Sequence, residues 1–358
     1  MAAPQAERDV VTAARTLLDS WKSSASTAGP DPGPAVLAAL VADPEAGRTW
    51  LRGAVRAAAG TGLFTGLGGV VAGLRLIPGA DSAAERAEAV LGQAAAHRRW
   101  RTTAVGFADY DLVSGPSGTL LAHFAGSTPV STDRLAPFTG HLTALADAHL
   151  SGLRIGAHSG HPLLGWSQDE ILTGLAHGAA GPLAALSLAG AEPDAIRNLA
   201  AWLAARTTTD SRGILTWSPR GRGKPGRQGW CYGTPGVSWA LWTAGRALGR
   251  AGAEFREIGL AAMGTLCAKY DPDTHLDGLG VCHGAAGMLL VADAFARQAG
   301  STPAAELRDW LRDHLHTRLD EVLRMGGTGL LSGAAGVLAA LLTADGRDRS
   351  WLPCLALS

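Results

Sequence analysis

The stretch Gly280-Val281-Cys282-His283-Gly284-Ala285-Ala286-Gly287 leads straight into the apolar run Met288-Leu289-Leu290-Val291. It contains one of six Gly-x-x-Gly steps, which begin at Gly66, Gly115, Gly178, Gly233, Gly284 and Gly333. Four of them run directly into an apolar stretch, and a helix that is apolar on all sides is a buried helix. Pro182, directly after the third step, favours the first turn of a helix. The repeat therefore predicts a buried helix that begins at each glycine step.

Between the steps lie amphipathic stretches that carry charge on one face, at residues 83–100, 194–206, 254–269 and 303–324. Each repeat thus predicts one buried and one half-exposed helix, and strand signals are almost absent. Helix-like stretches near Arg8–Trp21 and Arg48–Ala59 are expected to supply a seventh pair. A linear stack of pairs needs polar caps, whereas the chain ends on the apolar segment Trp351–Ser358, which favours closure into a ring.

The predicted fold class is therefore all-α, an α/α toroid of about seven inner and seven outer helices, in a single domain over residues 1–358. In such a ring the buried helices begin at one common end, where their unpaired N–H groups favour anions, thiolates included.

The overall composition excludes several classes of function. The 31 basic and 31 acidic residues cancel, so no nucleic-acid partner is expected. Four cysteines are too few for a disulfide framework in 358 residues. The N-terminus has no secretory signal, and no apolar run has the length of a membrane span. We expect a cytoplasmic protein without a membrane span.

Two of the glycine steps carry a candidate metal site. Cys231 and Cys282 each lie two residues before the first glycine of their step, and His283 follows Cys282. The repeat makes the two cysteines neighbours, and two thiolates with one imidazole form a zinc set with an open fourth position. The alternative is that these cysteines are small buried apolar residues, an interpretation that we prefer for Cys267 and Cys354.

An open zinc site with two thiolate ligands is suited to activating a thiol. A free thiol has a pKa near 8.5, so little of it is thiolate at neutral pH, and coordination deprotonates it. The expected reaction is attack of a zinc-bound thiolate on an electrophilic carbon.

At this point the chain resembles the lanthipeptide cyclases of the LanC type. The resemblance rests on Trp230-Cys231-Tyr232-Gly233-x-Pro235-Gly236, Cys282-His283-Gly284-x-x-Gly287 and Ala176-His177-Gly178-x-x-Gly181. It implies an α/α toroid with one zinc per chain, which adds peptide cysteine thiolates to dehydroalanine or dehydrobutyrine and so forms lanthionine or methyllanthionine rings. It also implies a dehydrated precursor peptide with a leader, a cognate dehydratase and an export transporter as partners.

The resemblance also implies roles for seven residues: Cys231, Cys282 and His283 as zinc ligands, and His177, Asp111, Arg227 and Tyr232 as catalytic residues. Michael addition creates an enolate, which Arg227 would stabilise, unless it holds Asp111 in place. His177 would deliver a proton to the enolate carbon, and Asp111 would orient His177 or take the thiol proton. The alternative for each is structural: a packed histidine, a helix cap, a solvated loop and a packed tyrosine.

Two other functions remain open, and a third is disfavoured. A relative that adds glutathione or another small thiol to dehydroamino acids would have the same site, and so would a non-catalytic zinc module that binds peptides. An α/α-toroid glycosidase needs paired carboxylates, and no such pair lies near the glycine steps. The basic loop at residues 212–227 is a candidate contact for an acidic leader or for the peptide backbone, and His158 and His161 are expected at the surface.

Overall fold

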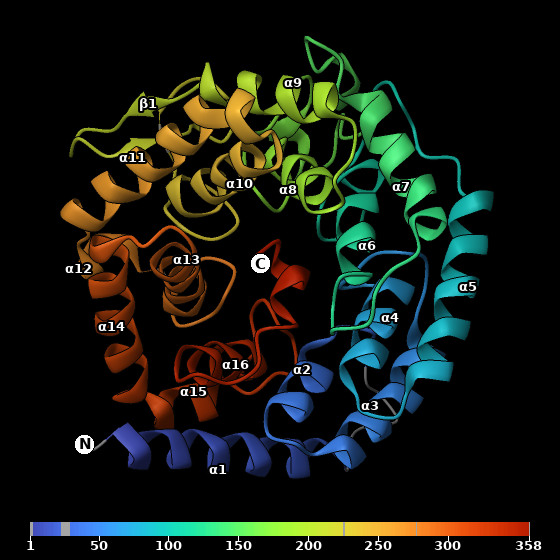
Figure 1. Cartoon of the computed structure of the whole chain (residues 1–358), viewed down its shortest axis with the longest axis vertical. Helices are drawn as coiled ribbons and strands as arrows, with labels where there is room; N and C mark the ends of the chain where they lie inside the picture. The colour runs from blue at the N-terminus through green and yellow to red at the C-terminus, as the bar shows by residue number, and fades with distance from the viewer. Residues whose placement is uncertain (1–2, 23–28, 225, 277, 358) are drawn as a thin grey trace. The chain divides into compact units, whose positions relative to one another are not determined.

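A computed structural model describes the chain except for residues 1–2, 23–28, 225, 277 and 358. The chain divides into two compact units (Figure 1). Unit 1 comprises Met1–Leu91, Ala122–Pro129 and Leu276–Ser358, and unit 2 comprises Gly92–Leu121 and Val130–His275. The single domain that the repeat indicates stays a prediction.

Both units are helical within the described residues. The elements of unit 1 are α1 (Ala3–Lys22), α2 (Gly33–Leu40), α3 (Pro44–Ala57), α4 (Leu67–Leu76), most of α5 (Asp81–His97), α13 (Ala285–Gln298), α14 (Thr302–His316), α15 (Leu319–Met325), α16 (Ala334–Ala344) and the 3-10 turn η6 (Leu352–Leu355). Those of unit 2 are η2 (Phe107–Asp109), α6 (Pro116–Ala122), α7 (Thr132–Leu145), η3 (Ser151–Leu153), η4 (Gly165–Ser167), α8 (Ala180–Leu188), α9 (Pro193–Ala204), β1 (Thr208–Thr209), β2 (Leu215–Thr216), α10 (Thr234–Ala247), η5 (Gly249–Gly252), α11 (Ala253–Lys269) and α12 (Pro272–His275).

All six glycine steps lie at helix starts, which confirms this prediction. Helices α4, α10, α13 and α16 begin directly after the first glycine of their step. Helix α6 likewise follows Gly115, and α8 begins two residues after Gly178. The small residues of each step thus form the first turn of a helix.

Glycine is required there because the preceding loop folds back over the helix start. A Cβ atom on Gly233 would lie 2.6 Å from the carbonyl oxygen of Arg227, and one on Gly236 would lie 2.1 Å from that of Trp230. Gly233 also has a φ of 79°, in the left-handed region that favours glycine. The same approach to the carbonyl oxygen six residues earlier recurs at Gly66, Gly69, Gly178, Gly181, Gly284, Gly333 and Gly336.

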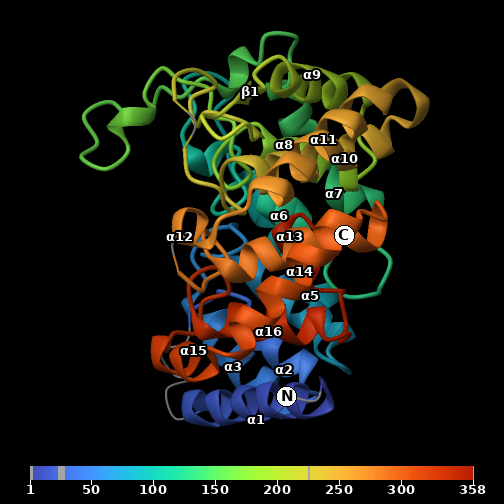
Figure 2. The ribbon, with the colours of Figure 1, turned by 90° about the vertical axis from the view of Figure 1, so that its left-hand side faces the viewer.

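Buried and half-exposed helices alternate along the chain, as predicted. Every residue of α16 is buried, and so is α13 from Ala285 to Phe295. Within the units, α13 contacts α14, α10 contacts α11, and α8 contacts α9 (Figures 1 and 2). The outer members begin at Thr302, Ala253 and Pro193, and they bury only one side. This pairing buries the apolar face of each outer helix on its inner neighbour.

The structure differs from the predicted elements at three places. The seventh pair consists of α2 and α3, because the buried member is Gly33–Leu40, whereas the predicted stretch near Arg8–Trp21 forms α1. The stretch at 303–324 is two helices, α14 and α15, separated by Thr317 and Arg318. Helix α7 was not predicted at all, and it contains a proline, Pro137.

Strands are nearly absent from the described residues, in agreement with the sequence. β1 and β2 are two residues long each and pair antiparallel, with Thr208 opposite Thr216. Among the helices of the described residues, none combines the length and the apolar character that crossing a membrane requires.

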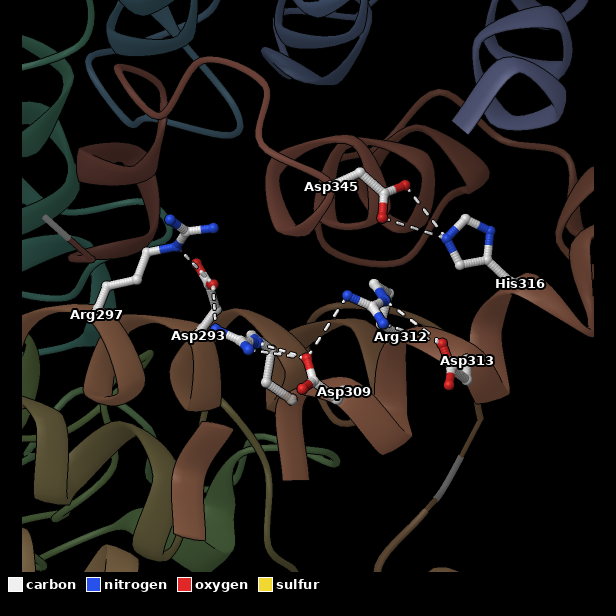
Figure 3. A network of polar contacts seen from close by, with 8 residues as sticks. Asp293, Arg297, Asp309, Arg312, Asp313, His316 and Asp345 are labelled. Atoms are coloured by element: carbon white, nitrogen blue, oxygen red, sulfur yellow. Dashed lines mark hydrogen bonds and ion pairs between the residues drawn. The ribbon is translucent and has the colours of Figure 1, made fainter. Parts of the chain in front are cut away.

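A buried carboxylate holds the elements of unit 1 together. Asp293 on α13 is fully buried, and its carboxylate lies 2.8 Å from Arg297 Nε. It also pairs with Arg349, close to the end of the chain, and with Arg308 of α14 at 3.9 Å. Figure 3 shows Arg297 directed at Asp293, with a chain of acidic and basic side chains continuing along α14.

We expect Asp293→Ala to lower the free energy of unfolding by about 3 kcal/mol, because it leaves arginine side chains without their buried partner. Urea unfolding followed by circular dichroism would measure this. Asp309→Ala is the matched control, since the Asp309 side chain is 47% exposed and pairs only at the surface of α14. Its effect should stay within about 0.5 kcal/mol. Equal effects of the two changes would contradict the role given to Asp293.

Candidate functional site

Three loops of unit 2 that precede buried helices are joined through their backbones. The Leu112 amide donates to the Ala176 carbonyl at 3.0 Å, and the Ala176 amide donates to the Cys231 carbonyl at 3.3 Å. The loops before α6, α8 and α10 therefore lie side by side. They carry Asp111, His177 and Cys231, which the sequence places far apart.

Asp111 and His177 form a direct pair. His177 Nδ1 lies 2.6 Å from Asp111 Oδ2, and the Asp111 side chain is fully buried while that of His177 is 30% exposed. The other carboxylate oxygen, Oδ1, accepts hydrogen bonds from the backbone amides of Ser114 at 2.7 Å and Gly115 at 2.8 Å. Asp111 thus caps the start of α6 and binds His177 at the same time.

This arrangement fixes the tautomer of His177. A carboxylate only accepts hydrogen bonds, so Nδ1 of His177 carries the proton that it shares with Asp111. Nε2 is then the nitrogen with which His177 exchanges protons.

Two residues that the sequence did not single out hold His177. The Phe107 ring stacks on the His177 ring, with centroids 4.5 Å apart and planes 21° apart. The Tyr110 hydroxyl donates to the His177 carbonyl at 2.7 Å, and burial raises the pKa of Tyr110 well above its usual value. Both precede Asp111 by a few residues in Phe107-Ala108-Asp109-Tyr110. This short distance from a predicted site residue is the feature of the sequence that could have identified them.

The expectation of a surface position is wrong for His158, although it is confirmed for His161. His158 is 7% exposed and meets the Phe107 ring edge-on at 4.5 Å. Its Nδ1 lies 2.9 Å from Ser167 Oγ, whose own proton goes to the Leu164 carbonyl. Burial lowers the pKa of His158, and the neighbouring histidines lower it further. The loop folds back on itself and encloses a side chain that its composition suggested was solvated.

The loop before α10 is tightly packed. Cys231 is 6% exposed, and Trp230 beside it is fully buried. Tyr232 is half-buried against Gly174, where a Cβ atom would lie 2.5 Å from the tyrosine ring. The residues on both sides of Cys231 are therefore packed against their surroundings, which restricts the position of Cys231.

In unit 1 the loop before α13 has an equivalent anchor. The amides of Val281 and Cys282 both donate to the Leu331 carbonyl, at 3.0 and 2.9 Å. Cys282 is half-buried and His283 is exposed, directly before the N-cap Gly284. Both side chains therefore lie at a helix start, where the partial positive charge favours a thiolate.

Cys231, Cys282 and His283 form a candidate metal site. Their ligand atoms all lie within 4.8 Å of one another. Tetrahedral zinc with sulfur and nitrogen ligands at 2.0–2.3 Å needs ligand atoms about 3.3–3.8 Å apart, which small side-chain rotations reach. Two sulfurs and one imidazole nitrogen are donors that zinc prefers. Among the described residues, no fourth histidine, cysteine or acidic residue belongs to the group.

The remaining cysteines lie outside this group, as expected. Cys354 is fully buried in η6, and burial raises the pKa of its thiol to about 12. Cys267 is half-buried on α11. A buried thiol with a raised pKa, such as that of Cys354, lacks the character of a reactive thiolate.

Arg227 and Tyr232 line one pocket of about 490 Å³ in unit 2. Arg227 is exposed and belongs to the basic loop, of which Pro225 lies outside the described residues. The structure thus forms three groups from the predicted residues. Arg227 and Tyr232 line one pocket, His177 pairs with Asp111, and Cys231, Cys282 and His283 form the candidate metal site. The catalytic roles given to these residues stay predictions.

Comparison with known proteins agrees with the fold and its sequence motifs. The solved structure of nisin cyclase matches with a TM-score of 0.79 and 17% sequence identity, over 96% of each chain. This likeness confirms the predicted fold class, an all-α α/α toroid. None of the curated proteins matches the chain in sequence. The family of lanthionine synthetase C-like proteins matches residues 40–357, and the chain belongs to this family.

Proposed function

We propose that this chain is a zinc-dependent cyclase that adds peptide cysteine thiolates to dehydroalanine or dehydrobutyrine, forming lanthionine and methyllanthionine. The observation that carries the proposal is the cluster of Cys231, Cys282 and His283. The His177–Asp111 pair lies on a loop bonded to that of Cys231, and this supports a catalytic role over mere binding. Membership of the family gives the proposal its reaction class.

Cys231, Cys282 and His283 would hold one zinc ion per chain. Bound there, zinc supplies an electropositive centre that keeps a substrate cysteine in its thiolate form near neutral pH. The burial of Cys231 keeps its sulfur from competing electrophiles, and the exposed His283 leaves room for a peptide at the open side.

Other residues of the protein would then act on the dehydroamino acid that accepts the thiolate. As the carbon–sulfur bond forms at the β-carbon, the electrons of the double bond move toward the carbonyl and create an enolate. His177 delivers a proton from Nε2 to the α-carbon, while Asp111 stabilises the imidazolium and fixes its plane. The proton that the thiol releases on becoming a thiolate replaces, through solvent, the one that His177 gives to the α-carbon. Hydrogen and sulfur are thus added across the double bond, with no other reactant consumed.

Arg227 and Tyr232 complete the proposed site. Both side chains line the same pocket, and this supports a role for each in contacting the peptide. A guanidinium is suited to the negative charge of the developing enolate or to a peptide carbonyl. Tyr232, packed on Gly174, provides a rigid wall for the peptide.

A dehydrated peptide with one cysteine and one dehydroalanine tests the proposal. Cyclisation conserves the mass but removes the free thiol, so thiol alkylation followed by mass spectrometry measures it. A matched peptide with serine in place of cysteine, given together with glutathione, tests the small-thiol alternative by its gain in mass. Peptide binding without either product would contradict the proposal and favour the non-catalytic module. A dehydratase that supplies the peptide, an export transporter and a cytoplasmic location stay predictions.

Phe107 gives a further prediction for turnover. Phe107→Leu removes the ring that stacks on His177, and a small misplacement of a catalytic group costs one to two orders of magnitude in rate. We expect kcat to fall about tenfold or more, with KM and zinc content unchanged, in steady-state kinetics of thiol loss. Phe107→Tyr keeps the stacking and should retain most of the activity.

Phe138→Leu is the matched control for this change. Phe138 is fully buried in the same unit but packs on Trp100, not on His177. It should lower stability without lowering kcat. If both leucine variants lose activity in proportion to their stability, Phe107 has only a structural role.

A further inference from the structure

We propose that the basic loop of unit 2 forms a binding site for an acidic segment of the peptide substrate. The site consists of two pockets, of about 490 and 560 Å³, which share Lys224, Gly226 and Arg227 in their lining. This inference rests on the proposed function, since it names the chemistry of that function's substrate. The volumes fall in the range of typical ligand sites.

Positive charge is concentrated in these two pockets, although the chain as a whole is neutral. The first pocket is lined by Arg220, Arg222, Lys224 and Arg227, and its lining holds no acidic residue. The second adds Arg212 to Lys224 and Arg227, with Asp210 as its acidic residue. Five cations around two adjoining pockets create a field that attracts a multiply charged anion.

The loop is held in place, so these cations are not merely solvated. Thr173, before α8, holds the loop by donating hydrogen bonds from its amide to the Pro219 carbonyl at 3.1 Å and from its hydroxyl to the Ser218 carbonyl at 2.9 Å. Arg222 pairs with Glu170 at 2.6 Å, which raises the pKa of the guanidinium. The Arg222–Glu170 pair anchors the loop beside the first pocket, whose lining also includes Arg220 and Lys224.

Asp210 is also occupied within its own turn. Its Oδ1 accepts from the backbone amides of Arg212 and Ile214, both at 2.9 Å. Arg212 in turn lies 2.7 Å from His275 Nε2, and burial and Arg212 both lower the pKa of His275. The carboxylates of Asp210 and Asp271 act on His275 in the opposite direction, so the second pocket has acidic as well as basic neighbours.

Aromatic and apolar side chains line the rim of the first pocket. Trp166 is 42% exposed, and the Arg220 guanidinium lies 5.6 Å from the centroid of its ring. Tyr232, next to the proposed zinc ligand Cys231, lines the same pocket. A chain bound here would lie beside the proposed thiol site.

These features favour a peptide that carries carboxylates next to apolar residues. Arginine and lysine bind carboxylates through charge-assisted hydrogen bonds, and the rings of Trp166 and Tyr232 offer apolar surface to the residues beside them. In an extended peptide, alternate residues point to the same side about 7 Å apart. Two glutamates separated by one residue could therefore occupy the cationic pockets while the residue between them faces the rim.

Direct binding tests this site without any turnover. The probes are fluorescein-labelled 12-residue peptides with neither cysteine nor dehydroamino acid, one rich in glutamate and leucine and one with glutamine for each glutamate. We expect the glutamate peptide to bind at least tenfold more tightly by fluorescence anisotropy, and its affinity to fall as salt is raised. Equal affinity of the two peptides would overturn the proposal.

Charge reversal localises the binding. Arg220→Glu combined with Lys224→Glu should weaken the glutamate peptide at least tenfold and strengthen binding of a lysine-substituted peptide. Arg250→Glu combined with Lys269→Glu is the matched control, because both residues are exposed in unit 2 and line neither pocket. An equal loss in the control would show that net charge alone is sensed, and would overturn the site.

Two further measurements test whether the pockets select phosphate and whether binding depends on zinc. A single-stranded oligonucleotide of 12 nucleotides that displaces the glutamate peptide at lower concentration would show that the pockets select phosphate, against the proposal. Binding of the glutamate peptide is also measured after chelation of zinc. Charge-dependent binding in a protein without cyclisation activity supports this site and contradicts only the proposed function.

Discussion

Replacing Cys231 by alanine is expected to remove the bound zinc and nearly all cyclisation. The native protein should contain about one zinc per chain by elemental analysis, and the variant little, because two ligands hold zinc far less tightly than three. Without the metal, a substrate thiol of pKa near 8.5 is only a few per cent thiolate at pH 7. The rate of thiol loss should therefore fall by about two orders of magnitude or more.

Cys267→Ala is the matched control for this change. Cys267 is half-buried on α11, outside the group formed by Cys231, Cys282 and His283. It should retain both zinc and activity. A native protein that holds no zinc after purification with zinc present, and whose thiols react equally with and without a chelator, would show that Cys231 and Cys282 only pack in the interior.

Replacing His177 by asparagine is expected to stop turnover while zinc content and peptide affinity stay unchanged. The asparagine amide can still donate to Asp111, so the loop keeps its place, but it cannot transfer a proton. General acid–base catalysis contributes about 10²–10⁴-fold, and kcat should fall within that range. Elemental analysis, peptide binding and the rate of thiol loss measure the three quantities separately.

The product of the His177→Asn variant gives a second readout. Protonation by water can reach the enolate carbon from both sides, so any residual ring should be a mixture of stereoisomers at the α-carbon. Chiral analysis of the hydrolysed product measures this. A single stereoisomer formed at the native rate would contradict the role of His177 as proton donor.

Asp111→Asn then separates the two roles open to the carboxylate. Because Oδ1 of Asp111 also holds the start of α6, asparagine keeps that backbone contact and changes mainly the charge facing His177. If Asp111 acts only through His177, the double variant should be no slower than His177→Asn alone. A further loss in the double variant would mean that Asp111 takes the thiol proton itself.

The sequence predicts the helix starts well because their signal is local. A glycine pair and the apolar run after it fall within one or two turns, and the six steps repeat. The pattern does not predict helix α2, because Gly33–Leu40 is short and lacks the glycine step that precedes the other buried helices. Helix α7 is obscured by Pro137, whose effect on a helix is usually to end it.

The sequence predicts the residues of the candidate site but not the residues that pack around them. Motif spacing selects Cys231, Cys282 and His283, and the structure brings them together. The stacking of Phe107 on His177 depends on contacts between residues 70 positions apart, which composition does not encode. The burial of His158 has the same origin, because a glycine-rich loop looks solvated until its own fold is known.

At five of the six steps the carbonyl six residues before the first glycine closes over the helix start, and this has an evolutionary consequence. Backbone atoms alone build this closure, so the side chain just before the glycine is free to vary without loss of the turn. Threonine, serine, histidine and tyrosine occupy that position at residues 65, 114, 177, 232, 283 and 332. A repeated scaffold of this kind acquires a ligand or a proton donor through single substitutions. New chemistry can therefore arise in it while the ancestral fold persists.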